Sequence, residues 1–280
     1  MKKAFGMSIL AIVILLTLIF MIKFKIFSKI GLIFSHKATA EQSSAKTSFD
    51  SLLKSAGSLE EQGELLHAKE VLNSILSDYA SKPGIEDVEK RLESLNMRIL
   101  FSAINIPGET TVYVVKENDY LQKVANEFNT TIDFIKRQNG LSSDVIRPNA
   151  RLRIWTGKFS VLVDKSQNLL TLKSNDEVIR TYRVSTGKEN ITPVGTFKIV
   201  NKLVHPDWSH NGKVVPYGNP ENILGTRWLG FDVPGYGIHG TTQPESIGQQ
   251  VTAGCVRMIN AQVEELFMLL PVGTEVTIID

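Results

Sequence analysis

The sequence predicts a multidomain chain: an N-terminal transmembrane helix, an α-helical segment, a small βααβ module and a C-terminal mainly-β domain with one late helix. Three observations support this fold class. An uncharged apolar run fills residues 5–22, apolar residues at helical spacing follow to about residue 102, and strand-like runs dominate from residue 158. The expected boundaries are 1–40, 41–105, 110–156 and 158–280.

The composition is that of a folded protein, with 42% hydrophobic and 21% charged residues among 280. A formal net charge of +2 gives no argument for a nucleic-acid partner. A chain with one cysteine cannot form an internal disulfide, so pairing does not reveal the redox compartment. That thiol is either a small buried apolar group or a reactive one, and its sequence context must decide.

The run FGMSILAIVILLTLIFMI at residues 5–22 is long enough to cross a bilayer as a helix. A cleavable signal peptide would show a small-residue site soon after such a run, but lysines and large apolar residues follow it. We therefore expect an uncleaved membrane anchor. Lysines flank the run on both sides, so charge alone does not give its orientation.

Residues 41–102 carry leucine, isoleucine and valine at three- and four-residue steps, which predicts amphipathic helices. Lys82-Pro83-Gly84 interrupts the pattern. Residues 58–79 loosely resemble a tetratricopeptide helix pair, with Gly63 and Ala68 as small contact residues. One such unit is too little to bury a repeat core. We interpret the segment as a helical spacer or as a docking surface for a protein partner.

Residues 111–154 follow a short linker at 105–108 and predict a strand, two helices and a closing strand. The strands are expected at 112–115 and 150–154, and the helices at 121–128 and 132–138. Thr130 and Thr131 lie where a helix N-cap belongs. The segment resembles a LysM module through Tyr113, Val115, Asp119, Leu121, Val124, Ala125, Phe128, Ile135, Asn139, Leu141, Ile146, Pro148 and Leu152.

This resemblance implies binding to glycans that contain N-acetylglucosamine, such as peptidoglycan. The alternative is a βααβ spacer that binds nothing. Two family glycines are replaced here, by Asn118 and Asn149. Asparagine tolerates the left-handed conformation better than most residues, so we expect both turns to survive.

From residue 158 the pattern changes to strands, expected at 159–163, 169–172 and 178–185, with a further strand after Pro193 and Gly195. Asn260 is expected to cap a helix that runs to about Leu270, and residues 275–279 to form a last strand. A unit of this length can bury its own core.

The stretch IHGTTQPESIGQQVTAGCVRM, residues 238–258, contains the cysteine and a histidine. A cysteine nucleophile needs a thiolate, which an adjacent histidine can generate and hold as an ion pair. Proline and glycine between them allow the loop to fold back and return Cys255 to His239. The N–H groups of Gly254 and Cys255 suit an oxyanion. In an extended chain Arg257 projects to the same side as Cys255, where it would clamp a substrate carboxylate or hold loop carbonyls.

Several short motifs lie along the C-terminal unit: TG at 186–187, TPVGTF at 192–197, GTR at 225–227, IHGT at 238–241, Pro244, SIG at 246–248 and TAGCVRM at 252–258. Through these residues the unit resembles the L,D-transpeptidases of the YkuD type, which remodel peptidoglycan through a catalytic cysteine. Many relatives have a histidine directly before the glycine–cysteine pair, where this chain has Ala253, so His239 would be the nearby base. We expect a backbone carbonyl to orient its other ring nitrogen, because no acidic residue is among these matching residues.

The resemblance implies catalytic roles for Cys255, His239, Gly254 and Arg257. No cofactor and no metal are expected, because the two histidines at 205 and 210 lack a companion carboxylate–histidine pattern. They fit a polar lid loop better. That loop would line a substrate groove with aromatic residues, although Trp228 is equally consistent with plain core. The expected substrate-binding residues are Gly240, Thr241, Thr252, Trp228 and Tyr217.

The implied reaction has two steps: Cys255 attacks a donor stem tetrapeptide and releases D-alanine, and an acceptor amine then resolves the thioester as a 3–3 cross-link. If water is the acceptor, the protein is an L,D-carboxypeptidase. If the acceptor is a lysine of another protein, that protein becomes attached to the cell wall. A non-catalytic wall-binding anchor is a third possibility. The expected partners are stem peptides, glycan strands and the membrane, with the body outside the cytoplasm, and carbapenems are expected to react with the thiol.

Overall fold

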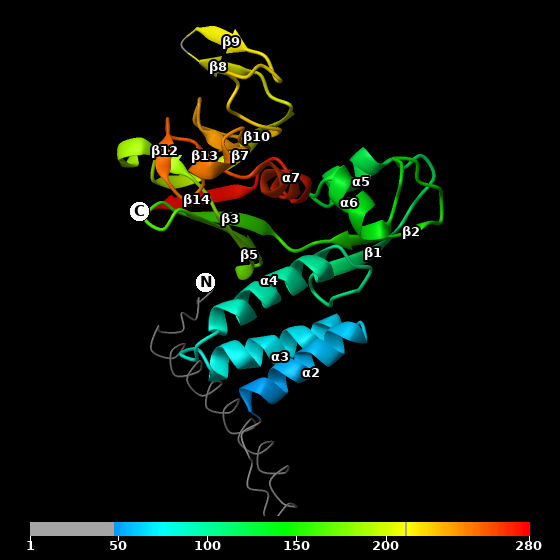
Figure 1. Ribbon diagram of the computed structural model, residues 1–280. Helices are drawn as coiled ribbons and strands as arrows, with labels where there is room; N and C mark the ends of the chain where they lie inside the picture. The colour runs from blue at the N-terminus through cyan, green and yellow to red at the C-terminus, as the bar shows by residue number, and fades with distance from the viewer. Residues whose placement is uncertain (1–47, 211) are drawn as a thin grey trace, which may run out of the picture. The chain divides into compact units, whose positions relative to one another are not determined.

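The computed structural model describes residues 48–210 and 212–280 (Figure 1). The anchor expected at residues 5–22 lies outside these residues. Within the described part of the chain, every helix is too short or too polar to cross a membrane.

Three helices form the first part: α2 (Phe49–Glu61), α3 (Leu65–Asp78) and α4 (Ile85–Leu100). Ser48 caps α2 by accepting a hydrogen bond from the Ser51 N–H at 3.2 Å. Gly63, at φ +79°, lies in the turn between α2 and α3, so its expected role as a helix contact residue is wrong. The helices enclose a core of their own, which includes Ala56, Ala68, Leu72, Ile75 and Leu95.

The LysM-like segment has the expected βααβ order: β1 (Thr110–Val114), α5 (Leu121–Glu127), α6 (Ile132–Asn139) and β2 (Arg151–Trp155). β1 pairs antiparallel with β2. Thr131 caps α6 by accepting a hydrogen bond from the Phe134 N–H at 3.0 Å. Asn118 and Asn149 adopt left-handed φ of 64° and 67°, as expected for residues that replace turn glycines.

The C-terminal domain contains an eight-stranded sheet in the order β13-β11-β10-β7-β14-β3-β4-β5. Its last strand in sequence lies in the middle, parallel to β3 and antiparallel to β7. The strands are β3 (Phe159–Asp164), β4 (Leu169–Ser174), β5 (Glu177–Arg183), β7 (Gly195–Val204), β10 (Arg227–Phe231), β11 (Gly237–His239), β13 (Val256–Arg257) and β14 (Glu275–Ile279).

Shorter elements decorate this sheet. β6 (Thr186–Gly187) pairs parallel with β12 (Gln250–Thr252), which holds the loop before the cysteine against the sheet domain. β8 (Trp208–His210) and β9 (Lys213–Val215) form an antiparallel hairpin where the sequence suggested a lid loop. Two 3-10 turns, Lys188–Asn190 and Pro244–Ser246, complete the connections.

Helix α7 (Asn260–Leu269) packs on one face of the sheet, where Leu229, Ile238 and Val256 are fully buried. Because side chains alternate along a strand, the neighbours of these residues point to the opposite face. Asn260 does not cap α7 as expected. Ile259 is the N-cap residue, and the Asn260 side chain contacts two other segments instead.

Helix α4 lies along β5, the strand at one edge of the large sheet (Figure 1). Asn96 donates to the carbonyls of Val178 at 3.2 Å and Ile179 at 3.4 Å. The Thr181 N–H donates to the Glu93 carboxylate at 2.9 Å. These side chains occupy backbone groups that an edge strand would otherwise leave unpaired.

The LysM-like segment shares a core with the C-terminal domain. Phe134 of α6 is fully buried and lies 5.9 Å, centroid to centroid, from Phe159 of β3. Arg153 of β2 donates to the carbonyls of Ile104 and Leu100 at 2.6 and 3.1 Å, just beyond and at the end of α4. Residues 105–108 therefore connect segments that are packed together.

Candidate active site

The single cysteine lies in a tight turn between β12 and β13. The Thr252 hydroxyl donates to the Cys255 carbonyl at 2.7 Å and accepts a hydrogen bond from the Gly254 N–H at 3.1 Å. Gly254 has φ +118°, and a Cβ there would lie 2.6 Å from the Tyr236 ring, so the turn requires glycine. The Gly254 N–H is engaged within the turn, and this differs from its expected role as an oxyanion donor.

The sheet places His239 on a strand beside the one that Cys255 precedes. Parallel pairing of β11 with β13 places His239 opposite Arg257 and Ile238 opposite Val256. Cys255 directly precedes β13, and both the Gly237 N–H and the Arg257 charge act on its thiol. The pairing of β11 with β13 therefore brings His239 near Cys255 in space.

His239 is held in one tautomer by the backbone. Its Nδ1 donates to the Gly240 carbonyl at 2.6 Å, because a carbonyl can only accept, and Nε2 is left as the basic nitrogen. This confirms the expected carbonyl partner. The side chain is 2% exposed, and burial lowers the pKa of His239 from 6.5 to about 4, with the charge of Arg257 adding to the shift. The imidazole is therefore neutral at physiological pH.

Cys255 is partly exposed, and its Sγ donates to the Gly235 carbonyl at 3.4 Å. Burial raises the pKa of Cys255 from 9.0 to about 11, while the Gly237 N–H and the Arg257 charge act in the opposite direction. A neutral thiol beside a neutral imidazole is the resting state that these values describe. The preformed ion pair expected from the sequence is not favoured here.

Arg257 is 4% exposed and braces the loop that follows His239. Its Nη1 donates to the Ser246 hydroxyl at 2.9 Å and to the Gln243 side-chain oxygen at 3.3 Å. Among the described residues, its buried Nε has no hydrogen-bond partner. The guanidinium therefore holds side chains of this loop, where the sequence suggested loop carbonyls, and it places a positive charge near the thiol.

A cavity of about 220 Å³ opens beside Cys255. Trp228 of β10, which was expected in a substrate groove, lines it together with Trp208 of the β8–β9 hairpin. Tyr217 lies elsewhere: it stacks on His205 at 4.1 Å between ring centroids and lines a different pocket with Thr226 and Asn260. The remaining walls are Leu203, Pro206, Asp207, Ser209, Leu224 and Gly235.

Gly240 and Thr241 support the histidine through Asn260, a residue that sequence reasoning treated only as a helix cap. The Asn260 Oδ1 accepts from the N–H groups of Thr241 at 3.0 Å and Thr226 at 3.2 Å, and its Nδ2 donates to the Thr241 carbonyl at 2.9 Å. A Cβ at Gly240 would lie 2.2 Å from that Oδ1. Thr241 is buried, so both residues fix the loop and do not line the cavity beside Cys255.

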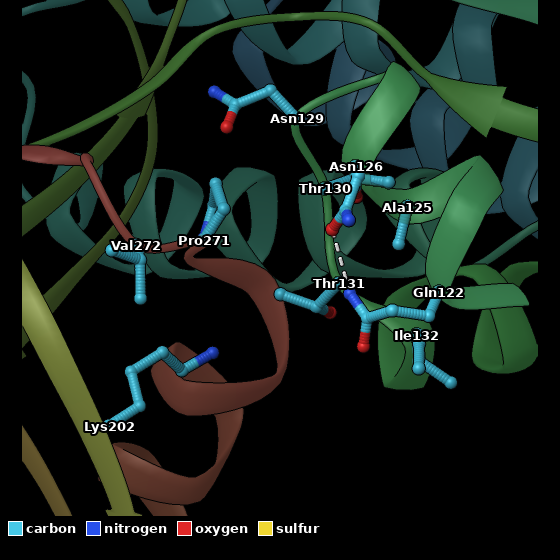
Figure 2. A pocket seen from close by; sticks show the side chains of 10 residues that line it. All are labelled: Gln122, Ala125, Asn126, Asn129, Thr130, Thr131, Ile132, Lys202, Pro271 and Val272. Atoms are coloured by element: carbon cyan, nitrogen blue, oxygen red, sulfur yellow. Dashed lines mark hydrogen bonds between the residues drawn. The ribbon is translucent and has the colours of Figure 1, made fainter.

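A larger pocket of about 470 Å³ lies between the LysM-like segment and the C-terminal domain (Figure 2). One wall comes from the α5–α6 corner, where Figure 2 shows Asn126, Asn129 and Thr131. The other wall contains Lys202, whose Nζ donates to the carbonyls of Phe267 and Leu270 at 2.6 and 2.7 Å. Lys202 precedes Leu203 of the cysteine cavity, so the two pockets lie on opposite faces of β7.

Comparison with known proteins finds matches to both the LysM-like segment and the C-terminal domain. The family model of the L,D-transpeptidase catalytic domain (YkuD) matches residues 158–278, and that of the LysM domain matches residues 113–155. The putative L,D-transpeptidase YqjB of Bacillus subtilis (strain 168) is 43% identical over 126 residues, which are 43% of this chain and 70% of that protein. The putative L,D-transpeptidase YkuD of the same strain is 33% identical over 173 residues, covering 59% of this chain and 97% of that protein.

The chain belongs to the YkuD family of L,D-transpeptidases and carries a LysM domain before its catalytic domain. Both resemblances expected from the sequence are confirmed. A solved L,D-transpeptidase from Mycobacterium smegmatis aligns over 47% of this chain and 64% of its own, with 19% identity and a TM-score of 0.40.

Proposed function

We propose that the protein is a peptidoglycan L,D-transpeptidase that works through a thioester on Cys255. The observation that supports this most is the placement of the chain's one thiol beside a cavity, directly before the strand that pairs with the strand of His239. The family membership of the chain supports the same reaction class.

In the first step, the Cys255 sulfur attacks the carbonyl of the diamino-acid residue in a donor stem tetrapeptide, and His239 Nε2 takes the thiol proton. The carbonyl oxygen becomes negatively charged, and we propose the Cys255 N–H as a donor to it. The C–N bond then breaks, the imidazolium gives its proton to the departing D-alanine amine, and a thioester remains.

In the second step, an amine from another stem attacks the thioester and His239 takes its proton. The C–S bond then breaks and the imidazolium returns that proton to the departing thiolate, which gives an amide cross-link, the free thiol and a neutral imidazole. Because the imidazole is neutral at rest, it can accept a proton in both steps. Arg257 stabilises negative charge on the sulfur while the ion pair exists. The stem peptide lies outside the cytoplasm, so we propose that the described part of the chain works there.

The first experiment mixes the purified protein with a carbapenem and measures the intact mass. We expect an adduct on Cys255, loss of the adduct in Cys255→Ala, and a normal adduct in Val251→Ala, which changes an exposed residue of the same segment. If the wild-type protein forms no adduct, Cys255 is not a working nucleophile, and the non-catalytic wall-binding anchor becomes the favoured function.

The reaction itself is tested by cell-wall digests from a host that expresses each variant. We expect 3–3 linked muropeptides with the wild type and none with Cys255→Ala. Tripeptide stems without cross-links would instead identify a hydrolase, and an unchanged digest from a stable protein would contradict both enzyme assignments.

We also propose that the LysM domain binds the glycan strands of the same polymer. Purified peptidoglycan should co-sediment with the wild type and equally with Cys255→Ala, because the thiol lies in the catalytic domain and not in the LysM domain. Failure of both proteins to co-sediment would indicate that the βααβ unit is a spacer.

A further inference from the structure

Asn201 is an unexpected residue in the interior of β7. Asparagine is depleted in strands, so its presence calls for a specific contact. β7 pairs Asn201 with Gly230 and Ile199 with Phe231, which leaves Val200 as an extra residue in a β-bulge. Bulges near active sites bend the strand and change the direction of a neighbouring side chain.

The Asn201 side chain holds the indole of Trp228. Its Oδ1 accepts a hydrogen bond from Trp228 Nε1 at 3.0 Å. Two glycines leave the space that the indole fills: a Cβ at Gly230 would lie 2.5 Å from Nε1, and a Cβ at Gly237 would lie 2.9 Å from Cζ2. The indole therefore lies against two positions without side chains, fixed at one end by Asn201.

The same indole contacts both parts of the candidate active site. Trp228 and His239 are register partners on β10 and β11, with ring centroids 6.0 Å apart and planes 20° from parallel. Trp228 also lines the cavity beside Cys255. Its position therefore limits rotation of the imidazole and shapes the space open to an acyl group near the sulfur.

We propose that Asn201 is a positioning residue: by fixing the Trp228 indole on the Gly230–Gly237 floor, it holds His239 in the orientation that serves Cys255. This inference rests on the proposed function only in its kinetic test, which measures acylation of Cys255. Asn201 does not line the cysteine cavity, so it acts through Trp228 and not on substrate. The other groups that face His239 are the Gly240 and Leu224 carbonyls and the Arg257 charge.

A double-mutant cycle tests this chain of contacts, with the rate of carbapenem acylation at Cys255 as the readout. Asn201→Leu removes the acceptor, and Trp228→Phe removes the donor but keeps an aromatic ring. We expect each single variant to slow acylation roughly tenfold, since small misplacements of catalytic groups have effects of that order or larger. The double variant should be no slower than Trp228→Phe alone, because the two changes break one contact.

Two further variants control for general effects. Val204→Ala changes an exposed residue of the same strand and should leave the rate unchanged. Gly230→Ala should slow acylation as Asn201→Leu does, because its methyl group would lie 2.2 Å from Asn201 Oδ1 and 2.5 Å from Trp228 Nε1 and so disrupt their hydrogen bond. Additive effects of Asn201→Leu and Trp228→Phe, or a normal rate in Asn201→Leu, would overturn the inference.

The titration of His239, followed by NMR, gives a readout that does not depend on any reaction. We expect the His239 midpoint to rise from near 4 toward 6.5 in Asn201→Leu, because a mobile indole lets water reach the imidazole. An unchanged midpoint with slowed acylation would overturn positioning through His239. A third outcome separates the two proposals. If a carbapenem does not acylate the wild type, but Asn201→Leu still shifts the His239 midpoint, the proposed function is contradicted and the contacts from Asn201 through Trp228 to His239 are supported.

Discussion

At the scale of residues, the thiol of Cys255 and the imidazole of His239 are both held in their neutral forms. Burial raises the pKa of Cys255 to about 11 and lowers the pKa of His239 to about 4, so each shift opposes charge separation. The Gly237 N–H and Arg257 favour the thiolate, but they do not outweigh burial. Proton transfer is therefore expected to accompany attack on the substrate and not to precede it.

This state can be measured by the ultraviolet absorbance of the thiolate across pH, as the difference between the wild type and Cys255→Ala. The folded thiol has a raised pKa, so thiolate absorbance should be low at neutral pH and appear with a midpoint near 11. Subtracting Cys255→Ala removes the tyrosine contribution. Strong thiolate absorbance at neutral pH would show an ion pair and contradict the neutral resting state.

At the residue level, the sequence reached furthest where one short motif contains the candidate chemistry. Cys255, His239 and the carbonyl that orients the imidazole all lie within residues 238–258. Asn201 and Asn260 were not identified as supporting residues, because each acts on the site through a contact made by the folded sheet. Tyr217 was expected in the substrate groove, but its stacking on His205 places it beside another pocket.

At the scale of elements, α4 acts as a cover for the edge of the catalytic sheet. Among residues 48–210 and 212–280, no strand pairs with the outer side of β5, and an exposed edge is a template for pairing with another chain. Asn96, at 3% exposure, and Glu93 occupy backbone groups of this strand, and Lys69 pairs with Glu177 at 2.7 Å. The helical segment, expected to be a spacer or a docking surface, thus covers part of this edge, and we expect it to limit association of the catalytic domain.

Asn96→Ala tests this role. The variant leaves the Ile179 carbonyl without its side-chain donor, and an unsatisfied buried group costs about 1–3 kcal/mol. We expect a lower free energy of unfolding by urea titration, and more oligomer by size-exclusion chromatography. Glu89→Ala, at an exposed position of α4, should stay within about 0.5 kcal/mol of the wild type. Equal stability of the two variants would contradict an edge-covering role.

The elements that the sequence predicted best are those set by local chemistry. In the LysM domain, a threonine cap and the left-handed Asn118 and Asn149 fix ends of helices and strands. The order of the large sheet was not predictable in this way, because β14 is the last strand in sequence and pairs between β3 and β7. Hydrophobic alternation indicates that a strand exists but not which strands it pairs with.

At the scale of the whole described molecule, the LysM and catalytic domains are joined by adjacent residues of one helix. Phe134 of α6 is buried in the catalytic core cluster, while its neighbour Ile135 is buried in the core of the LysM domain. A glycan held by the LysM domain would then stand at a fixed position from the thiol. Packed contacts, and not the length of a flexible linker, would set the local concentration of substrate.

Phe134→Ala and Ile135→Ala form a matched pair that tests this coupling, since both truncate a fully buried side chain on the same helix. Loss of the Phe134 ring leaves a cavity in the catalytic core, which costs about 3–5 kcal/mol. We expect Phe134→Ala to lower the temperature at which Cys255 stops reacting with a carbapenem by several degrees, and Ile135→Ala to lower it less. If Phe134→Ala leaves that temperature unchanged, the two domains are stable independently, and the fixed placement of glycan and thiol is wrong.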